Sequence, residues 1–247
     1  MGMHGILGSV GGFIKRRGSW TANSGELDQY VPYLEAGWQM EASSGNEPDV
    51  VGSVDLTDQN GVGSYADAPI GLMRTFNGSN QYFLVTGANA AALQPTSGFV
   101  LSTWVYFTSD KSVFQWADSG AGNSKIECYD DGTLKFRVRQ SDATLKQLDT
   151  GFSLSYSTLY HIVLMAENGF LRAYVDADEK GTALAFDDTY HTTNRQINLG
   201  AAYATYYTAG RQGATYMFLD FSFADGTAQD NFADGFYNSG AGSKYIP

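Results

Sequence analysis

The segment Asp55–Val85, DLTDQNGVGSYADAPIGLMRTFNGSNQYFLV, decides the fold class. It contains two clusters of turn-forming residues, Asp-Gln-Asn-Gly at 58–61 and Asn-Gly-Ser-Asn at 77–80. Gly and Asn accept a positive φ angle, and such clusters connect the strands of β-hairpins. After the second cluster, Tyr82 and Leu84 occupy alternate positions, which is the period-two pattern of half-buried strands. The segment therefore predicts β-hairpins.

The rest of the chain continues as short segments of β character separated by turns. Gly98–Phe107 (GFVLSTWVYF) is apolar at both odd and even positions, which predicts a central strand covered on both faces. Leu134–Arg139 places Phe136 and Val138 on one side and Lys135, Arg137 and Arg139 on the other, which predicts one buried and one outward side. Further strands are expected at Val31–Met40, Ser112–Trp116, Lys125–Tyr129, Leu159–Ala166, Phe170–Val175, Ile197–Gly200 and Ala214–Phe223. The series favours an antiparallel β-sandwich, with one helical turn expected at Asp230–Tyr237.

The composition agrees with a well-ordered all-β protein. Of the 247 residues, 17 % are charged and 14 % are aromatic, with 29 Gly and only 5 Pro. Few charges and many aromatic and turn-forming residues are typical neither of helical bundles nor of disordered chains. The length suits one large β domain or two small ones with a substantial core, in which we expect Trp104 and Trp116.

Charge and cysteine content limit the partners. The net charge is −11, and general nucleic-acid binding would need clustered Lys and Arg. Cys128 is the only cysteine, so the chain can form no internal disulfide, which fits folding in a reducing compartment. No basic neighbour in the sequence activates this thiol, which we therefore expect to be packed in the core.

The N-terminal segment, MGMHGILGSVGGFIKRRGSW, is rich in glycine and basic. Its apolar part precedes its basic residues, which is the wrong order for a signal peptide, and no run in the chain approaches the length of a membrane span. We expect a flexible arm over residues 1–30 that becomes ordered against a partner. A disordered or a membrane-active segment is an alternative. The residues expected to dock this arm are Phe13, Lys15, Arg16, Arg17 and Trp20.

Several ordered motifs together resemble the laminin-G-like, concanavalin A-type jelly-roll domains. The family's early "D-x-x-G-x-x-x-L-T" pattern is similar to Asp49, Gly52, Leu56 and Thr57 here. Further similar segments follow in the family's order at Phe76–Phe83, Ser102–Val105, Asp131–Phe136, Leu159–Val163, Leu171–Asp176, Ile197–Gly200 and Phe236–Gly242. The resemblance implies an antiparallel jelly-roll sandwich over residues 31–247. The chain departs from the family in its last strand, Leu219–Phe223, and at Asn77, where the family often has Asp.

The residues give little support to catalysis, although some members of this superfamily are glycoside hydrolases. Such enzymes need two facing carboxylates, about 5–5.5 Å apart in the retaining class. A Glu-x-Asp pattern at Glu26-Leu27-Asp28 lies in the arm and has no Glu two positions after it, and Glu127 and Asp130, three apart, would face opposite sides of a strand. We expect no catalytic residue and interpret His161, where the family commonly has a structural His, as hydrogen-bonded within the fold and His191 as part of a polar loop.

Two kinds of ligand site are candidates. Many laminin-G-like domains hold calcium through loop carboxylates, and the acidic loops here are Asp130/Asp131, Asp176/Asp178 and Asp187/Asp188. A hairpin turn explains Asp176–Gly181 better than a calcium loop does, so no residue is assigned to the metal. The segment Ala201–Tyr216 is expected to be a loop that binds a sugar, binds a protein, or packs on its own sheet. Its candidate ligand or interface residues are Tyr203, Tyr206, Tyr207, Arg211 and Tyr216.

These features favour a structural component of a bacteriophage virion. The family usually acts outside cells, whereas this chain shows no export signal and one cysteine, as expected of a protein made in a host cytoplasm and exposed on a particle. The basic arm would dock on a capsid, tail or fibre while the acidic sandwich faces outward. Expected partners are other virion proteins, further copies of the chain in a homo-oligomer, and host surface glycans. A stand-alone lectin is the alternative, and a glycan-cleaving enzyme is a third.

Overall fold

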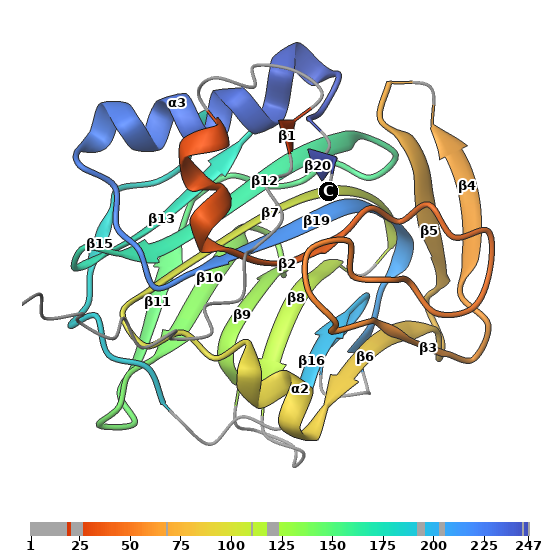
Figure 1. Cartoon of the computed structure of the whole chain (residues 1–247), viewed down its shortest axis with the longest axis horizontal. Coiled ribbons are helices and arrows are strands. Elements are labelled where there is room, and N and C mark those ends of the chain that lie inside the picture. The colour runs from red at the N-terminus through yellow and green to blue at the C-terminus, as the bar shows by residue number, and fades with distance from the viewer. Residues whose placement is uncertain are drawn as a thin grey trace, which may run out of the picture.

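The chain folds as two large antiparallel β-sheets packed face to face (Figure 1). The computed structural model describes residues 19–20, 27–67, 69–109, 111–117, 124–191, 196–202, 206–243 and 245–246, with backbone alone at 19–20, 111, 124–125, 206 and 245–246. Strand pairing within these ranges is antiparallel throughout. The predicted antiparallel jelly-roll sandwich is therefore confirmed.

The two sheets contain strands from all along the chain. In spatial order, the seven-stranded sheet consists of β11 (Leu145–Asp149), β10 (Leu134–Arg139), β9 (Ser124–Asp130), β8 (Lys111–Ala117), β16 (Gln196–Leu199), β6 (Tyr82–Thr86) and β3 (Thr57–Gln59). The nine-stranded sheet consists of β14 (Asp178–Glu179), β13 (Phe170–Val175), β12 (Leu159–Glu167), β7 (Gly98–Ser109), β19 (Ala209–Leu219), β5 (Gly71–Asn77) and β4 (Gly63–Asp67), with β15 (Leu184–Ala185) beside β13 and β2 (Leu34–Trp38) beside β19. Two small ribbons pair β1 (Ser19–Trp20) with β20 (Tyr245–Ile246) and β17 (Ala201–Ala202) with β18 (Tyr206–Tyr207).

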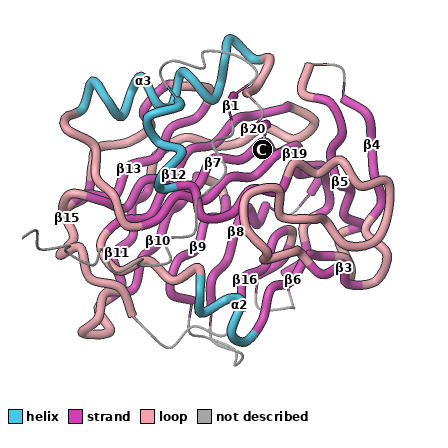
Figure 2. Tube along the Cα trace, viewed as in Figure 1, coloured by secondary structure: helices cyan, strands magenta, loops and turns pink. Residues whose placement is uncertain are grey.

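The helices are short and lie outside the sandwich (Figure 2). They are η1 (Asp28–Tyr33), α2 (Gly87–Ala92), α3 (Gly226–Tyr237) and η2 (Asn238–Gly240). The helical turn expected at Asp230–Tyr237 belongs to α3, which begins earlier because the Asp225 side chain caps it, accepting a hydrogen bond from the Ala228 N–H at 3.0 Å. The expectation of a single helical turn was wrong, because α2 and η1 were missed.

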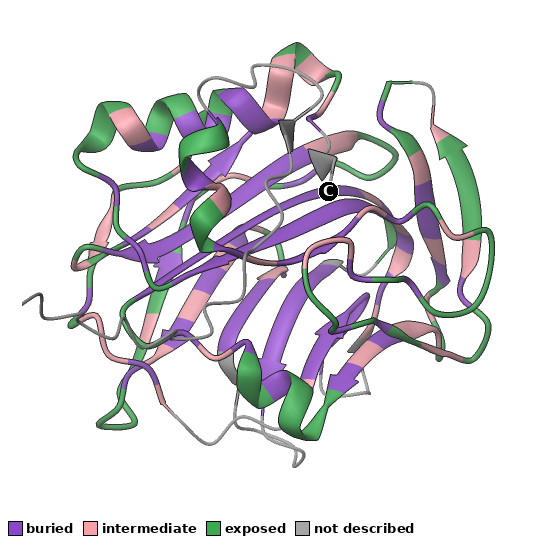
Figure 3. Cartoon of the chain, in the orientation of Figure 1, coloured by how far each residue is buried: buried purple, intermediate pink, exposed green. Residues whose placement is uncertain are grey.

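The main core lies between the two sheets, whose facing strand surfaces are buried (Figure 3). Phe136 and Val138 of β10 are buried there, while Lys135, Arg137 and Arg139 alternate with them on the outward side, as predicted. Both tryptophans are buried as expected, Trp116 fully within this core and Trp104, 5 % exposed, in a small separate cluster with Ile70 and Met73.

A second, aromatic core lies on the outer face of the nine-stranded sheet. The inner side of α3 places Phe232 and Phe236 on this face, against Phe218 of β19. Leu27 and Tyr30 are buried in the same cluster, so the end of the segment assigned to the arm packs on the sandwich. This second layer explains why β7 is apolar on both sides.

The motif around Asp49 stabilises the loop that follows β2. The Asp49 carboxylate accepts hydrogen bonds from the backbone N–H groups of Gly37 and Val51, both at 3.0 Å, and of Val54 at 3.1 Å. A Cβ atom at Gly52 would lie 2.8 Å from the same carboxylate, so a side chain there would displace it. The Asp and Gly of this motif are thus both structural.

A buried ion pair fixes the next part of this loop on β5. Arg74 and Glu47 are 0 % and 1 % exposed, and the Arg74 Nη1 lies 3.0 Å from the Glu47 Oε2. Arg74 also donates to the carbonyl oxygens of Gly45, Val62 and Gly63 at 2.9–3.0 Å, and its guanidinium lies 4.8 Å from the centre of the Phe83 ring. This arginine joins four chain segments.

Candidate functional site

The outer face of the nine-stranded sheet continues beyond the end of α3. Tyr237, the last residue of α3, stacks on Trp104 of β7 with ring centres 6.0 Å apart. Tyr106, two residues further along β7, shares the outward side of Trp104 and pairs in register with Arg211 of β19. The edge strand β4, which is separated from β19 by β5, contributes Tyr65 and, two residues later, Asp67. We call Tyr65, Asp67, Tyr106 and Arg211 the tyrosine–arginine site.

Gly210 and an irregular pairing register of β19 position Arg211 in this site. A Cβ atom at Gly210, whose φ is +154°, would lie 2.1 Å from the Tyr106 carbonyl oxygen, so only glycine allows β19 to approach β7 here. The pairing register also shifts on either side of Arg211, between Ala209 and Gly210 and between Gln212 and Thr215. Such irregularities change the direction in which side chains point.

The Arg211 guanidinium lies over two tyrosine rings. Its Cζ atom is 3.4 Å from the centre of the Tyr65 ring and 4.3 Å from that of Tyr106. The Asp67 carboxylate lies 3.9 Å from the Arg211 Nη1, which is within ion-pair range but beyond hydrogen-bond distance. Within the described parts of the chain, the Arg211 side chain donates no hydrogen bond. Its contacts with the two rings therefore hold it in place, and no acceptor in the described residues takes its side-chain N–H donors.

The site is accessible from outside. Tyr65 is 45 % exposed, and the side chain of Arg211 is 21 % exposed. Tyrosine rings pack against the apolar C–H faces of sugars, and their hydroxyls exchange hydrogen bonds. A guanidinium beside them supplies several N–H donors for ligand oxygen atoms. The arrangement is suited to binding a polar ring.

The structure corrects the expected loop at Ala201–Tyr216. Its first part forms the β17–β18 ribbon, but from Ala209 onward it is the central strand β19. Tyr216 is 1 % exposed and packs on Phe236 with ring centres 5.7 Å apart, so its assignment as a ligand residue was wrong. Tyr207 lies elsewhere, paired with Tyr82 at 5.9 Å. Tyr203 and the Tyr206 side chain lie outside the described residues.

The structure thus retains Arg211 from the predicted set and adds partners that sequence reasoning missed. Tyr65 and Tyr106 are separated from Arg211 by many residues, and only sheet pairing brings them together. A tyrosine at an alternate, outward-facing position of a predicted strand is the signal that could have indicated Tyr106. Of the expected docking arm, Phe13, Lys15, Arg16 and Arg17 lie outside the described residues, and Trp20 is placed only through the backbone pairing of β1 with β20.

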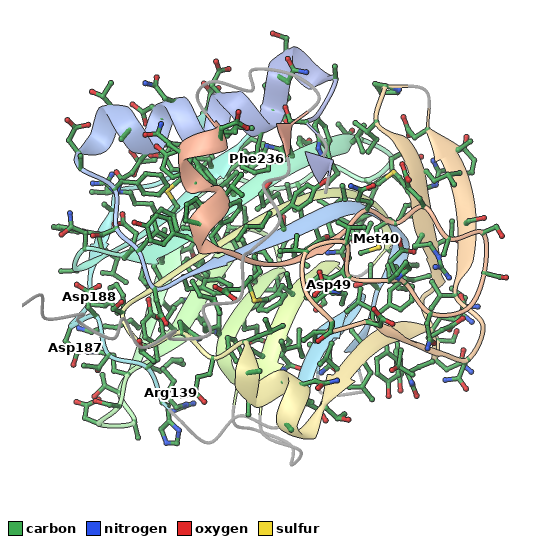
Figure 4. All side chains as sticks on the ribbon, in the orientation of Figure 1. Met40, Asp49, Arg139, Asp187, Asp188 and Phe236 are labelled. Carbon is green, nitrogen blue, oxygen red and sulfur yellow. The ribbon has the colours of Figure 1, made fainter. Side chains whose placement is uncertain are left out.

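The side chains of the acidic loops accept hydrogen bonds from backbone N–H groups. Asp130 accepts from the N–H groups of Gly132 and Leu154, at 2.9 and 2.7 Å. Asp176 accepts from the His161 N–H at 2.8 Å. Asp187 and Asp188 lie at the edge opposite β4 and β5 (Figure 4), and Asp187 accepts from the Thr189 N–H at 3.1 Å. No group of three or more potential metal-binding side chains gathers within the described ranges.

His161, Cys128 and Glu127 are buried within the fold. His161 is 1 % exposed, and its Nε2 lies 2.9 Å from the Ser102 Oγ, as the predicted hydrogen-bonded histidine requires. Burial lowers the pKa of His161 to about 3, so the ring is neutral at pH 7. Cys128 is fully buried, and this burial raises the pKa of its thiol well above the ordinary value, as expected for a packed thiol. On the outward side of β9, Tyr129 follows Glu127, and no second carboxylate pairs with Glu127 on the neighbouring strands.

Comparisons with known proteins identify the fold. A laminin G-like family model described as the concanavalin A-like lectin/glucanases superfamily matches residues 77–214, which is 138 of the 247 residues. No curated protein matches the sequence significantly. No helix in the described ranges has the length and apolar character to span a membrane.

Solved structures of low sequence identity share the fold. Domain 4 of AbnA, a GH43 extracellular arabinanase from Geobacillus stearothermophilus in complex with arabinotriose, is 14 % identical with a TM-score of 0.62, covering 82 % of this chain and 98 % of that one. The botulinum neurotoxin serotype D ligand-binding domain in complex with N-acetylneuraminic acid is 11 % identical with a TM-score of 0.61, covering 84 % of this chain and 51 % of that one. Trypanosoma rangeli sialidase in complex with the inhibitor DANA is 14 % identical with a TM-score of 0.58, covering 85 % of this chain but only 33 % of that one.

Proposed function

Because this chain belongs to the concanavalin A-like lectin/glucanase superfamily, we propose that it is a carbohydrate-binding domain without catalytic activity and that its ligand docks on the tyrosine–arginine site. The observation that carries the proposal is the exposed Tyr65 ring beside an arginine whose donors are unused. Two of the similar structures contain a sugar, arabinotriose in one and N-acetylneuraminic acid in the other, which supports a sugar as ligand.

The absence of catalysis is part of the proposal. Most glycoside hydrolases use a general acid and a second carboxylate on opposite sides of the glycosidic bond. Asp67 is the one carboxylate within 4 Å of Arg211 among the described residues, and no second carboxylate belongs to the tyrosine–arginine site. Among the described residues, the site therefore offers groups that can bind a sugar and one carboxylate, whereas the usual cleavage needs two.

Replacing Tyr65 with alanine should weaken sugar binding about 5- to 10-fold, because one exposed stacking ring is lost. Titration calorimetry of the full chain with the best ligand from a glycan array measures the change. Tyr156→Ala, which removes a 55 % exposed tyrosine outside the site, is the matched control and should bind as the parent does. Equal losses in both variants, or no array ligand at all, would contradict the proposal. Mass spectrometry of the sugar recovered after incubation tests for catalysis. Cleavage products would refute the proposal that the domain is not catalytic.

We further propose that this domain is displayed on a bacteriophage virion, where its basic arm attaches it to a capsid, tail or fibre. The support comes from charge and redox chemistry. Residues 1–20 carry +3 from Lys15, Arg16 and Arg17, so the remaining residues carry −11 − 3 = −14. A positive segment on a strongly acidic domain can bind an acidic scaffold while the domain itself stays outside. The buried Cys128 needs no oxidising compartment.

Neutralising the arm should reduce incorporation into particles at least several-fold, because the attraction to an acidic scaffold is lost. The full chain carrying Lys15→Gln, Arg16→Gln and Arg17→Gln is compared with Lys146→Gln/Lys180→Gln, which removes charge from the sandwich instead. Immunoblotting of purified particles measures incorporation. Unchanged incorporation of the arm variant would refute docking by these residues, and an unassembled protein that still binds sugar would favour the stand-alone lectin.

A further inference from the structure

We propose that the tyrosine–arginine site selects a sugar residue that carries a carboxylate, a uronic or a nonulosonic acid, which Arg211 binds through its in-plane N–H groups. This inference rests on the proposed function and specifies its ligand class. It follows from the hydrogen bonding of Arg211, from its orientation and from the charge of the chain.

The first argument compares Arg211 with the other arginines that lie on aromatic rings. Arg74 over Phe83 and Arg172 over Phe170 both use their donors, Arg74 on Glu47 and three carbonyl oxygens and Arg172 on Glu179 at 2.7 Å. Arg137 over Tyr129 donates to the Gln147 Oε1 at 2.6 Å. Arg211 combines the shortest ring distance of the four with no hydrogen bond to the described residues. Among these four arginines, Arg211 is therefore the one whose side-chain donors find no acceptor in the described residues.

The second argument concerns the direction of the unused donors. The Arg211 Cζ lies 3.4 and 4.3 Å from the centres of the two rings, so Tyr65 and Tyr106 lie against this planar group. The donors of a guanidinium point outward within that plane, in a fork that matches the two oxygens of a carboxylate. A neutral sugar hydroxyl engages one such donor, whereas a carboxylate engages two and neutralises the charge. Asp67 at 3.9 Å orients the group without using its donors.

The third argument is electrostatic. A chain with a net charge of −11 repels anionic ligands over most of its surface, so binding one requires a local cation that is already in place. Arg211 is held by Tyr65 and Tyr106 before the ligand arrives, which lowers the entropy cost of ordering it. Because the attraction acts at a partly exposed site, added salt should weaken binding of an acidic sugar more than that of a neutral one.

The test measures pairs of probes that differ only at the acidic group. The full chain is titrated with methyl α-galacturonoside and methyl α-galactoside, and with the methyl glycoside of N-acetylneuraminic acid and its methyl ester. In each pair the carboxylate should bind about 10-fold or more tightly in whichever sugar series fits the site, because a bidentate charge-assisted contact is gained. That series identifies the source of the carboxylate. Galactose 6-sulfate is the third arm of the test and should bind more weakly than the preferred carboxylate probe.

Variants at Arg211 decide whether this residue reads the carboxylate. Arg211→Gln should abolish the preference for the acid while leaving the neutral probe within about 2-fold, and Arg211→Lys should recover a minor part of it because an ammonium lacks the planar fork. Arg172→Gln, which alters another ring-stacked arginine, is the matched control and should keep the preference. Equal binding of acidic and neutral probes, tighter binding of the sulfate, or an equal effect of Arg172→Gln would each overturn the inference and leave the proposed function standing. Binding of no sugar by the parent chain would overturn both.

Discussion

Replacing Arg74 with methionine should lower the free energy of unfolding by about 3–5 kcal/mol, the usual cost of leaving one member of a buried ion pair without its partner. Glu47, which is 1 % exposed, would lose its ion-pair partner, and the carbonyl oxygens of Gly45, Val62 and Gly63 would lose their donor. The loop after β2 would then detach from β5. Urea denaturation followed by tryptophan fluorescence measures the change.

The matched control is Arg172→Met, which breaks the Arg172–Glu179 pair. Its two side chains are 23 % and 32 % exposed, so its loss should cost no more than about 1 kcal/mol. The double variant Arg74→Met/Glu47→Gln should be less destabilised than the sum of its single variants, since removing both charges leaves none unpaired. If Arg74→Met costs no more than Arg172→Met, the buried pair is not important for stability.

Replacing Phe232 with alanine should cost a similar amount, about 3–5 kcal/mol, because a large ring leaves a cavity in a packed layer. Phe232 is fully buried, and its ring centre lies 4.8–5.2 Å from those of Tyr30, Phe218, Phe223 and Phe236. These neighbours belong to η1, β19, the segment before α3, and α3 itself. Loss of the ring should therefore loosen the helix from the sheet.

Hydrogen exchange distinguishes a local from a global effect of this substitution. We expect protection to fall first in Gly226–Tyr237 and to persist in β7 and β12, whose inner sides belong to the main core. Phe170→Ala, which removes a ring that is 42 % exposed, is the control and should cost less than about 1 kcal/mol. Uniform loss of protection over both layers would show that α3 and the sandwich unfold as one unit.

The sequence predicts those parts of the fold whose signal is local. Leu134–Arg139 and Phe170–Val175 are strands with the expected bounds, because turn residues end them and alternation marks their buried side. The Asp49 motif is equally local, since its carboxylate binds backbone groups within 12 positions of it. Such features depend on neighbours in the chain and can be recognised without the tertiary structure.

The candidate site depends on contacts that no local pattern contains. Gly210 and Gly213 made the start of β19 resemble a loop, because glycine disfavours strands unless another backbone or a large side chain comes close, as Tyr106 and Trp104 do here. The sequence also predicted that Tyr216 would be exposed, because nothing in the local pattern indicated that α3 covers this residue. Tyr65 of β4 and Arg211 of β19 come into contact because β5 lies between their strands and pairs with both. The order of the strands in the sheet therefore determines the site, and the spacing of residues in the sequence does not predict this order.

The buried Cys128 makes the protein convenient for chemical labelling. Its thiol has a raised pKa, so little thiolate forms at neutral pH, and no solvent reaches it. No other cysteine is present in the chain. A cysteine introduced at an exposed position such as Tyr156 or Leu145 would thus be the single group to react with a maleimide dye. One fluorophore per molecule at a chosen distance from Arg211 could then report on ligand arrival without any change to the native thiol.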